Sequence, residues 1–333
     1  MPPHDQGQTD IWSNEASVTV IGESVIDIIH DPLNATGAPQ KHPGGSPLNV
    51  AIGCSRLGLR TRLVTHYAED RHGQLIADHL DGNRVEAVVG GSLPTSTASA
   101  TLDGRGAADY TFSLSWDITG ASIQALAAVE GSLHIHTGSI AAVLAPGSAS
   151  VKALTEAAHP YATISFDPNC RPDITPDTPA TRQRIEDFVA TSDIVKASDE
   201  DLQWLYPERT AEESLRAWCR LGPGIVVLTR GAQGPVVLSR SGQIDMPAEP
   251  IRLADTVGAG DSFMAALISG LAQLNALGAA ARQQLYGITR DQLQALVSYA
   301  NRAAGITCSR TGANPPWLHD LGHLPGAATY QGQ

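Results

Sequence analysis

Asp255-Thr256-Val257-Gly258-Ala259-Gly260-Asp261-Ser262-Phe263 carries the chain from a glycine-containing loop into an apolar run that ends at Leu274. Such a change is typical of a loop that leads into a helix, which we expect over about 260–274. Glycine lets the backbone approach a bound anion, and the first turn of a helix offers free N–H groups and the positive end of its dipole. The stretch therefore predicts a phosphate or oxyanion site.

Asp261 places a carboxylate in the first turn of this expected helix, beside the predicted anion site. A negative charge there repels phosphate, so its presence suggests a chemical role, namely a base for phosphoryl transfer. An ordinary glycine-containing turn followed by a first-turn acid explains the same residues. The nine residues alone leave both interpretations open.

Composition narrows the classes of protein that this chain can belong to. Its 333 residues are 42% hydrophobic and 17% charged, which predicts a globular protein of one large or two modest domains. The net charge of −12 and the scarcity of lysine (Lys41, Lys152 and Lys196) argue against a nucleic-acid surface. Four cysteines lie far apart, without metal-ligand spacing, and are expected to be reduced thiols.

The first ten residues lack the basic and apolar regions of a signal peptide. The longest apolar stretches fall short of the roughly 20 residues that a bilayer span requires. We therefore expect a soluble, cytoplasmic protein without a membrane segment.

The N-terminal part predicts strands and a helix. The run from Val18 to Ile21 is expected as a strand, followed after Gly22 by a second strand that places Asp27 near a strand end, where α/β sheets bind ligands. A helix is expected over about 47–57, with Ser46 as its N-cap and Gly58 just past its end.

Alternating patterns at 99–102 and 109–112, around a turn at 103–106, predict a hairpin. From about 130 onward, apolar runs alternate with helical patterns, which predicts a doubly wound α/β fold with a mostly parallel sheet flanked by helices. The remainder from Pro315 is expected to be irregular. The expected strands are 133–136, 163–167, 193–197 and 225–229, and the expected helices about 148–158, 178–191, 198–205, 211–221 and 289–308.

Two segments resemble the signatures of one family. The sequence 255–263 resembles the second signature of the ribokinase-like, or PfkB, carbohydrate kinases, and the segment from Gly44 to Gly58 resembles the first. The resemblance implies that Asp261 is the catalytic base and that the amides of Gly258, Ala259 and Gly260 form the anion hole. It implies ATP and Mg²⁺ as cofactors, with a small-molecule sugar as the other substrate.

On the sugar side, Gly-Glu-x-x-x-Asp at 22–27 resembles the family's N-terminal sugar-binding segment, and 167–171 resembles the Asp-x-Asn-x-Arg segment of fructokinases and ketodeoxygluconate kinases. The resemblance implies sugar or phosphate contacts by Asp27, Gly44, Gly45, Asn49, Gly138, Arg171 and Asp261.

On the nucleotide side, Lys196-Ala197-Ser198-Asp199-Glu200-Asp201 departs from the family's Asn-x-x-Glu motif. Ser198 stands in place of the Asn of that motif and Asp201 in place of the Glu. The resemblance therefore implies Asp201 as a candidate Mg²⁺ ligand, although a capping box between Ser198 and Asp201 explains the same residues. Asp255, with the 307–312 segment, corresponds to a monovalent-cation site of many relatives and implies K⁺. The implied nucleotide contacts are Ser198, Thr229, Gly231, Gly234, Gly258, Gly260 and Asn301.

The chain is thus expected to form one kinase domain over 18–315, with tails at 1–17 and 316–333 and a β-sheet lid from about 28–43 and 95–115. By analogy with the family, two lids could pair into a homodimer. We expect an ATP-dependent sugar kinase, with fructokinase first, because Val25 stands where ribokinases have an asparagine and the segment 110–114 lacks an arginine for an acidic sugar. Ribokinase, 2-keto-3-deoxygluconate kinase, nucleoside kinase and a non-catalytic relative are the alternatives.

A rival interpretation is a dinucleotide-dependent dehydrogenase, but Phe263 stands where its fingerprint needs a third glycine. A Walker P-loop is excluded, since the chain has no Gly-Lys pair. His134 and His136 share one face of an expected strand; without a third ligand in view they are interpreted as core histidines rather than as a metal site.

Overall fold

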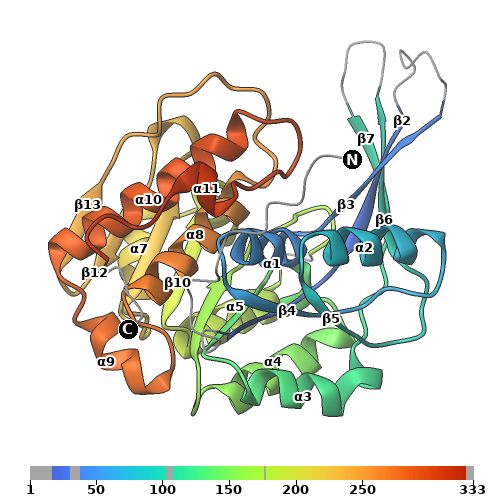
Figure 1. The fold of residues 1–333 in the computed structure, drawn as a ribbon, viewed down its shortest axis with the longest axis horizontal. Helices are drawn as coiled ribbons and strands as arrows, with labels where there is room; N and C mark the ends of the chain where they lie inside the picture. Colours follow the sequence, from blue (N-terminus) through green and yellow to red (C-terminus); the bar gives the residue numbers. More distant parts are fainter. Residues whose placement is uncertain (1–16, 31–37, 103–107, 176–177, 328–333) are drawn as a thin grey trace, which may run out of the picture.

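The computed structural model describes residues 17–30, 38–102, 108–175 and 178–327. Its strands form two sheets, of which the larger has nine strands (Figure 1). Neighbouring strands of this sheet are parallel except where β12 pairs with β11 and β13. In spatial order the strands are β13 (Gly242–Asp245), β12 (Val236–Ser239), β11 (Ile225–Thr229), β10 (Ile194–Ser198), β9 (Thr163–Asp167), β8 (His134–Gly138), β1 (Ser17–Ile21), β4 (Arg60–Thr65) and β5 (Glu86–Val89).

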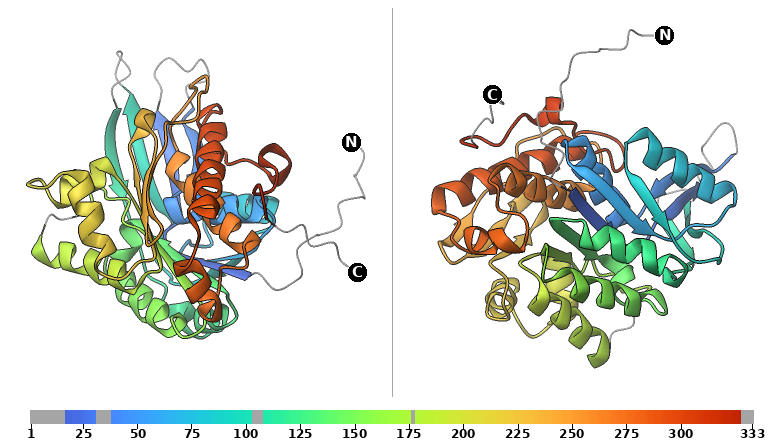
Figure 2. Two further views of the ribbon diagram at one scale, coloured as in Figure 1. Left: turned by 90° about the vertical axis from the view of Figure 1, so that its left-hand side faces the viewer. Right: turned by 60° about the horizontal axis from the view of Figure 1, so that its bottom comes forward.

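Helices cover both faces of the large sheet and pack on two separate apolar cores. In the left-hand view of Figure 2, the yellow-green helices of one layer and the red helix of the other lie on opposite sides of the sheet. One core receives side chains from α1 (Ser46–Arg56), α2 (Arg71–Gly82), α8 (Ala259–Gln273), α9 (Arg282–Tyr286), α10 (Arg290–Cys308) and α11 (Leu318–Leu321). The other receives them from α3 (Ser122–Glu130), α4 (Gly147–Ala158), α5 (Pro179–Thr191), α6 (Asp199–Leu205) and α7 (Ala211–Cys219).

Burial on both faces explains why the central strands read as continuous apolar or β-branched runs rather than as alternating patterns. Strands β9 and β11 have the bounds predicted from the sequence, and β9 is buried along its whole length. The doubly wound α/β fold is thereby confirmed, with the carboxyl ends of the parallel strands at one edge of the sheet.

The smaller sheet has four strands and is formed by the segments expected to make the lid; in Figure 1 it extends away from the large sheet beside α2. Its order is β3 (Gln40–Gly44), β2 (Val25–His30), β6 (Ser96–Leu102) and β7 (Ala108–Ser113). The expected hairpin exists as the antiparallel pair β6 and β7, while its turn at 103–106 lies outside the described residues. Residues 31–37 lie outside them too, and pairing of two lids stays a prediction.

The C-terminal segment differs from the irregular tail that we expected. It contains α11, and Leu321 and Leu324 are buried in the core shared with α8 and α10. Trp317 lies against the Arg56 guanidinium, 5.0 Å from the ring centroid. Spaced prolines and glycines hid this packing, because the few apolar residues between them form no helical period. Within the described ranges, no helix is both long and apolar enough to cross a membrane.

Candidate active site

The N-terminus of α8 forms the centre of the candidate site. Gly258 is the N-cap residue, with a left-handed backbone (φ 74°), and a Cβ there would lie 2.7 Å from Cβ of Ala313. Glycine is therefore required at 258 by both conformation and space. Ser262 N–H is bonded back to Gly258 O over 2.9 Å, and Ala259 N–H donates weakly to Thr256 O at 3.3 Å. The first turn of α8 thus begins where the sequence predicts an anion site, and anion binding there stays a prediction.

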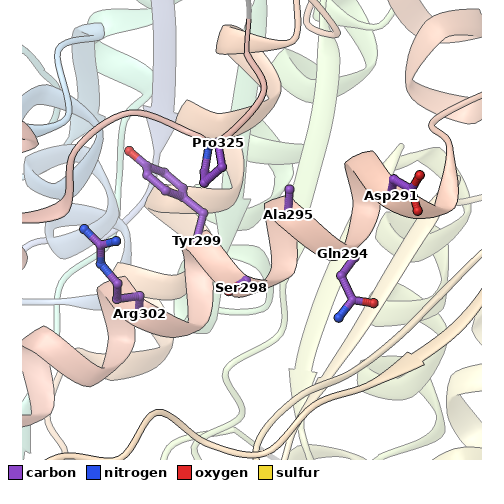
Figure 3. A pocket seen from close by; sticks show the side chains of 7 residues that line it. All are labelled: Asp291, Gln294, Ala295, Ser298, Tyr299, Arg302 and Pro325. Carbon is purple, nitrogen blue, oxygen red and sulfur yellow. The ribbon is translucent and has the colours of Figure 1, made fainter.

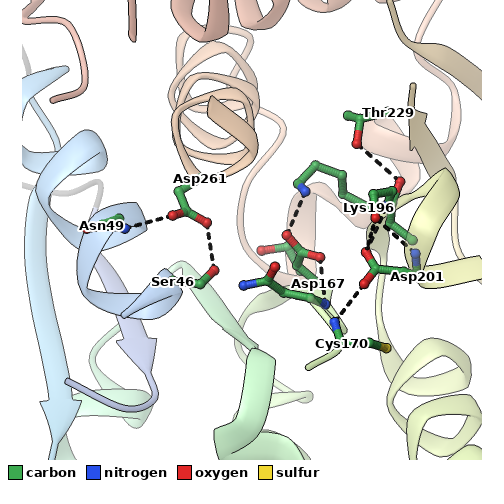
Figure 4. A network of polar contacts seen from close by, with 12 residues as sticks. Ser46, Asn49, Asp167, Cys170, Lys196, Asp201, Thr229 and Asp261 are labelled. Carbon is green, nitrogen blue, oxygen red and sulfur yellow. Dashed lines mark hydrogen bonds and ion pairs between the residues drawn. The ribbon is translucent and has the colours of Figure 1, made fainter. Parts of the chain in front are cut away.

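Asp261 lies in this first turn, with 9% of its surface exposed. Its two carboxylate oxygens accept hydrogen bonds from Ser46 Oγ (2.7 Å) and Asn49 Nδ2 (2.8 Å), both on α1 (Figure 4). Burial raises the pKa of Asp261 above its usual range, while the two hydrogen bonds act in the opposite direction. The structure thus joins segments more than 200 residues apart at one carboxylate.

Ser46 does not have the predicted role of N-cap. Gly45 is the N-cap residue of α1, with φ 107°, and Ser46 is the first helical residue. A serine before a proline resembles a cap, but here its hydroxyl bonds to Asp261 from another part of the chain. Gly58 has the predicted place beyond the helix end, with φ 92°.

The expected sugar-side residues gather between the lid and α1. A Cβ on Gly44 would lie 2.5 Å from Asp27 Oδ2, so the absence of a side chain lets this carboxylate lie against the backbone. Burial raises the pKa of Asp27, and the charges of His42 and Arg171 lower it. Gly45 likewise admits the backbone oxygen of Glu23, at 2.7 Å from its would-be Cβ.

Two other expected sugar residues have local roles in this structure. Gly138 pairs with Asp167 on the next strand, and a Cβ there would collide with the Asp167 carbonyl oxygen. The Arg171 guanidinium is folded back on its own loop and donates to Asn169 Oδ1 (2.8 Å) and Cys170 O (2.9 Å). Contacts of Gly138, Arg171 and Asn49 with a sugar stay predictions.

Below α8 lies a buried ion pair on neighbouring strands. Lys196 Nζ of β10 is 2.7 Å from Asp167 Oδ2 at the end of β9, and Figure 4 shows this pair between Asp261 and Asp201. Asp201 Oδ1 accepts from the amide of Cys170 (2.6 Å), and Oδ2 accepts from Ser198 N (2.8 Å) and Oγ (2.7 Å). Burial and the nearby charge of Asp167 raise the pKa of Asp201.

The capping box between Ser198 and Asp201, the second interpretation offered by the sequence, is formed in the structure. It engages both oxygens of Asp201, so Mg²⁺ ligation by this residue stays a prediction. Among the residues that the structure describes, no group of three or more His, Cys, Asp or Glu side chains is placed to hold a metal ion.

The expected nucleotide residues lie at two strand ends, in the loop after β11 and on α10. Ser198 and Thr229 are paired in the register of β10 and β11, side by side at the strand ends. Gly234, with φ 80°, packs against the backbone of 246–248, and Asn301 Nδ2 donates to Pro247 O at 2.9 Å. Gly231, with φ 50°, faces open space. The amide of Asn301 therefore supports the loop before the anion site, and its contact with a nucleotide stays a prediction.

Asp255 connects the two segments that the resemblance brought together. Its Oδ1 accepts from Val257 N (3.1 Å), and its Oδ2 accepts from Gly312 N (2.8 Å). Burial opposes the charge, but these backbone bonds lower the pKa of Asp255. The carboxylate thus ties the loop of the anion site to the end of α10.

A separate pocket of about 450 Å³ runs along α10 (Figure 3). Its lining residues are Asp291, Gln294, Ala295, Ser298, Tyr299, Arg302 and Pro325. It shares no residue with the cluster around Asp261, which therefore remains the candidate active site.

Sequence reasoning missed Ser46 as a partner of Asp261 and Lys196 as a buried cation; it placed Glu23 in the expected sugar-binding segment but not its burial or its contact with Ala141. Burial raises the pKa of Glu23 to about 7, and Ala141 N–H donates to its carboxylate at 3.1 Å. A signal existed for Lys196, because a lone lysine inside an apolar strand is seldom buried without a partner. For Ser46 and Glu23 the partners are distant in sequence and gave no local signal.

Comparison with known proteins agrees with this geometry. A family model described as pfkB family carbohydrate kinase matches residues 15–320 of this chain. A fructokinase from Rhizobium leguminosarum bv. trifolii is 31% identical over 262 residues, which make up 77% of this chain and 80% of that protein.

Solved structures show the same fold. A fructokinase from Xylella fastidiosa with bound ATP has a TM-score of 0.79 at 22% identity, over 90% of this chain and 94% of that one. A fructokinase double mutant from Vibrio cholerae O395, in a form bound to fructose, ADP and potassium ion, has a TM-score of 0.72 at 26% identity, over 95% and 97%. The likeness to the Xylella protein bears on the fold alone.

Proposed function

This chain belongs to the pfkB family of carbohydrate kinases, and from that premise we propose that it transfers the γ-phosphoryl group of ATP to a hydroxyl group of fructose. The observation that carries the proposal is the place of Asp261. This carboxylate lies in the first turn of α8, beside the amides of the anion site, and is bonded to Ser46 and Asn49 of the predicted sugar segment. One side chain thus borders both expected substrates.

In the proposed reaction, Asp261 accepts the proton of the sugar hydroxyl as the oxygen attacks the γ-phosphorus. The new O–P bond forms while the bond to the β-phosphate oxygen breaks, and its electron pair leaves with ADP. The raised pKa of Asp261 makes it a stronger base than an exposed aspartate. The amides of Gly258, Ala259 and Gly260 stabilise the charge on the phosphoryl oxygens.

The cation requirements belong to the proposal. The charge of the ATP phosphates would be neutralised by Mg²⁺, which keeps several waters and needs only one or two protein carboxylates. Asp201, in the first turn of α6, is the carboxylate that we propose for this, and binding would compete with the hydrogen bonds that it accepts from Cys170 and Ser198. K⁺ would be held by Asp255 and the 307–312 segment, to which Asp255 is already bonded.

Fructose as the acceptor is supported by the relatives and by Val25. This residue is buried in the lid, with a methyl group 3.9 Å from a would-be Cβ on Gly44, and so presents an apolar surface near Asp27. A ribose pocket with an asparagine there would gain a hydrogen bond that Val25 cannot make, and an unmet buried hydroxyl costs about 1–3 kcal/mol. Ribose, ketodeoxygluconate and nucleosides are the alternative acceptors.

The test is ADP release across a panel of sugars. The value of kcat/KM for fructose should exceed the values for ribose, ketodeoxygluconate and adenosine. If ribose or a nucleoside is preferred by more than about tenfold, the interpretation of Val25 is wrong. If ADP release is independent of every sugar, the chain is not a sugar kinase in practice, and the non-catalytic alternative gains support.

A further inference from the structure

Lys196 is a cation in an unusual place. Only 4% of the residue is exposed, and a Cβ on Gly260 would lie 3.1 Å from its Nζ. The ammonium therefore lies directly under the first turn of α8, next to the amides of the predicted anion site. Lysine is almost never fully buried unless it is paired.

The helix opposes a positive charge at this point. The N-terminus of a helix carries the equivalent of about half a positive charge, so a cation there is disfavoured. Burial opposes the charge of Lys196 as well, but the nearby carboxylates of Asp167, Asp201 and Asp261 outweigh burial and hold its pKa above the usual range. Lys196 Nζ is thus held in place under α8 by its 2.7 Å contact with Asp167.

The Lys196 ammonium lies on the side of Asp261 that faces the expected nucleotide residues. Ser46 and Asn49 bind Asp261 from the sugar side, whereas Lys196 lies on the side of Thr229 (Figure 4). Thr229 is an expected nucleotide residue, as is its partner in the strand register, Ser198. A phosphoryl group on its way from ATP to the sugar must pass between these two sides. It would meet the negative charge of Asp261, which an adjacent cation offsets.

We propose that Lys196 is a catalytic residue that donates a hydrogen bond to an oxygen of the transferring phosphoryl group, and that Asp167 positions it. This inference rests on the proposed phosphoryl transfer. Lys196 keeps its proton throughout, and the proton of the sugar hydroxyl goes to Asp261. Asp167 fixes Nζ by their 2.7 Å contact and does not itself touch the substrate.

The first experiment measures whether Lys196 senses the γ-phosphoryl group. In Lys196→Met, the affinity for the β,γ-imido analogue of ATP should fall by about tenfold or more, while the affinity for ADP stays within threefold. The value of kcat should fall by about 10²- to 10³-fold, with partial recovery in Lys196→Arg. Lys152→Met is the matched control, because Lys152 also forms a 3.0 Å ion pair, with Asp187, but on the surface.

The second experiment separates catalysis from charge balance in the core. Lys196→Met leaves Asp167 buried without its cation, which by itself destabilises the fold. The double variant Lys196→Met/Asp167→Asn removes both charges, so chemical unfolding should show that stability is regained. Our proposal predicts that kcat and analogue affinity stay as low as in Lys196→Met, whereas recovery of both would show that Lys196 only neutralises Asp167.

The affinity ratio of the analogue to ADP is measured without sugar, so it tests Lys196 apart from the sugar assignment. If no sugar supports ADP release but Lys196→Met loses the preference for the analogue, the proposed function fails and the contact of Lys196 stands. If wild-type protein phosphorylates a sugar and Lys196→Met keeps the wild-type ratio and kcat, the kinase stands and this inference is overturned.

Discussion

Two buried polar clusters lie side by side on one face of the large sheet, and they differ in charge. Strand β9 contributes to both clusters, because Thr163, Ser165 and Asp167 are every second residue of the strand and so point to the same face. In the middle of the sheet, Ser165 Oγ bonds His134 Nε2 and His136 Nδ1, each at 2.8 Å. At the carboxyl end, Asp167 pairs with Lys196 near Asp261. One strand thus passes from a neutral cluster to a charged one.

The polar groups of the neutral cluster form hydrogen bonds with one another. Burial lowers the pKa of both His134 and His136 to about 3, so each ring is uncharged at neutral pH and shares its hydrogen bonds with hydroxyl groups. The charged cluster instead has three carboxylates around one ammonium at the positive end of a helix. Burial alone therefore does not distinguish the two clusters, whereas the excess of carboxylates at the strand ends does.

Apart from loss of Asp261 itself, the largest effect on turnover is expected from breaking the anion site beside the charged cluster. Gly258→Ala puts a methyl group at φ 74° and 2.7 Å from Cβ of Ala313, so the first amides of α8 must move. We expect kcat to fall by about 10²- to 10³-fold. Gly326→Ala is the control for backbone strain, because Gly326 has φ 78° in open space, and it should leave kcat within twofold. Equal losses in the two variants would contradict this account of the anion site.

Glu23 is a further buried carboxyl group, just past the end of β1. Its pKa of about 7 lies above the unfolded value, so folding is favoured by protonation, and this stability is present below about pH 4.5 and lost as the pH rises through 7. Glu23→Gln should therefore gain stability over wild type across this window, by at most about 3 kcal/mol. Urea unfolding at several pH values measures this, and a difference that does not change with pH would contradict it.

The neutral cluster should matter for stability and not for turnover. Ser165→Ala removes the hydroxyl shared by His134 and His136 and should cost about 1–3 kcal/mol of unfolding free energy. Ser192→Ala, which removes a buried hydroxyl bonded to one helical carbonyl, should cost less. A kcat for Ser165→Ala that differs from wild type by more than threefold would show that the two clusters are functionally coupled.

The smallest effect is expected from the monovalent cation. Asp255 ties the loop of the anion site to Gly312, so a bound K⁺ would order the loop, and exchange of K⁺ for tetramethylammonium at equal ionic strength should lower kcat by about fivefold. The K⁺ response should be weaker in Asp255→Asn. Identical rates in both salts would remove K⁺ from the proposal.

Much of the fold could be predicted because its signals are local. The apolar runs of β9 and β11 and the glycine-to-apolar change before α8 gave these elements nearly their observed bounds. Strand β4 and helix α2 were not predicted, although the buried residues of α2, Gly73, Ile76 and Leu80, recur at helical spacing. The short antiparallel strands β12 and β13, of four residues each, were missed as well.

The site was predicted less completely, because its key contacts are tertiary. The signature glycines and Asp261 stand next to one another in sequence, so their assembly could be foreseen. The bonds from Ser46 and Asn49 to Asp261 cross more than 200 residues, and the pairing of Lys196 with Asp167 depends on the order of the strands. Local periodicity does not determine which strands are neighbours. The sequence therefore shows Lys196 inside an apolar strand but not its pairing with Asp167.

The most direct measurement is single-turnover transfer of labelled γ-phosphate from ATP to fructose, with Asp261→Asn and Ser165→Ala compared side by side. Asp261→Asn should slow transfer by about 10²- to 10⁴-fold, because the base is lost while the carboxamide keeps the shape of the site. Ser165→Ala should transfer within threefold of wild type. Near-normal transfer by Asp261→Asn, or an equal loss in both variants, would contradict the assignment of catalysis to the charged cluster.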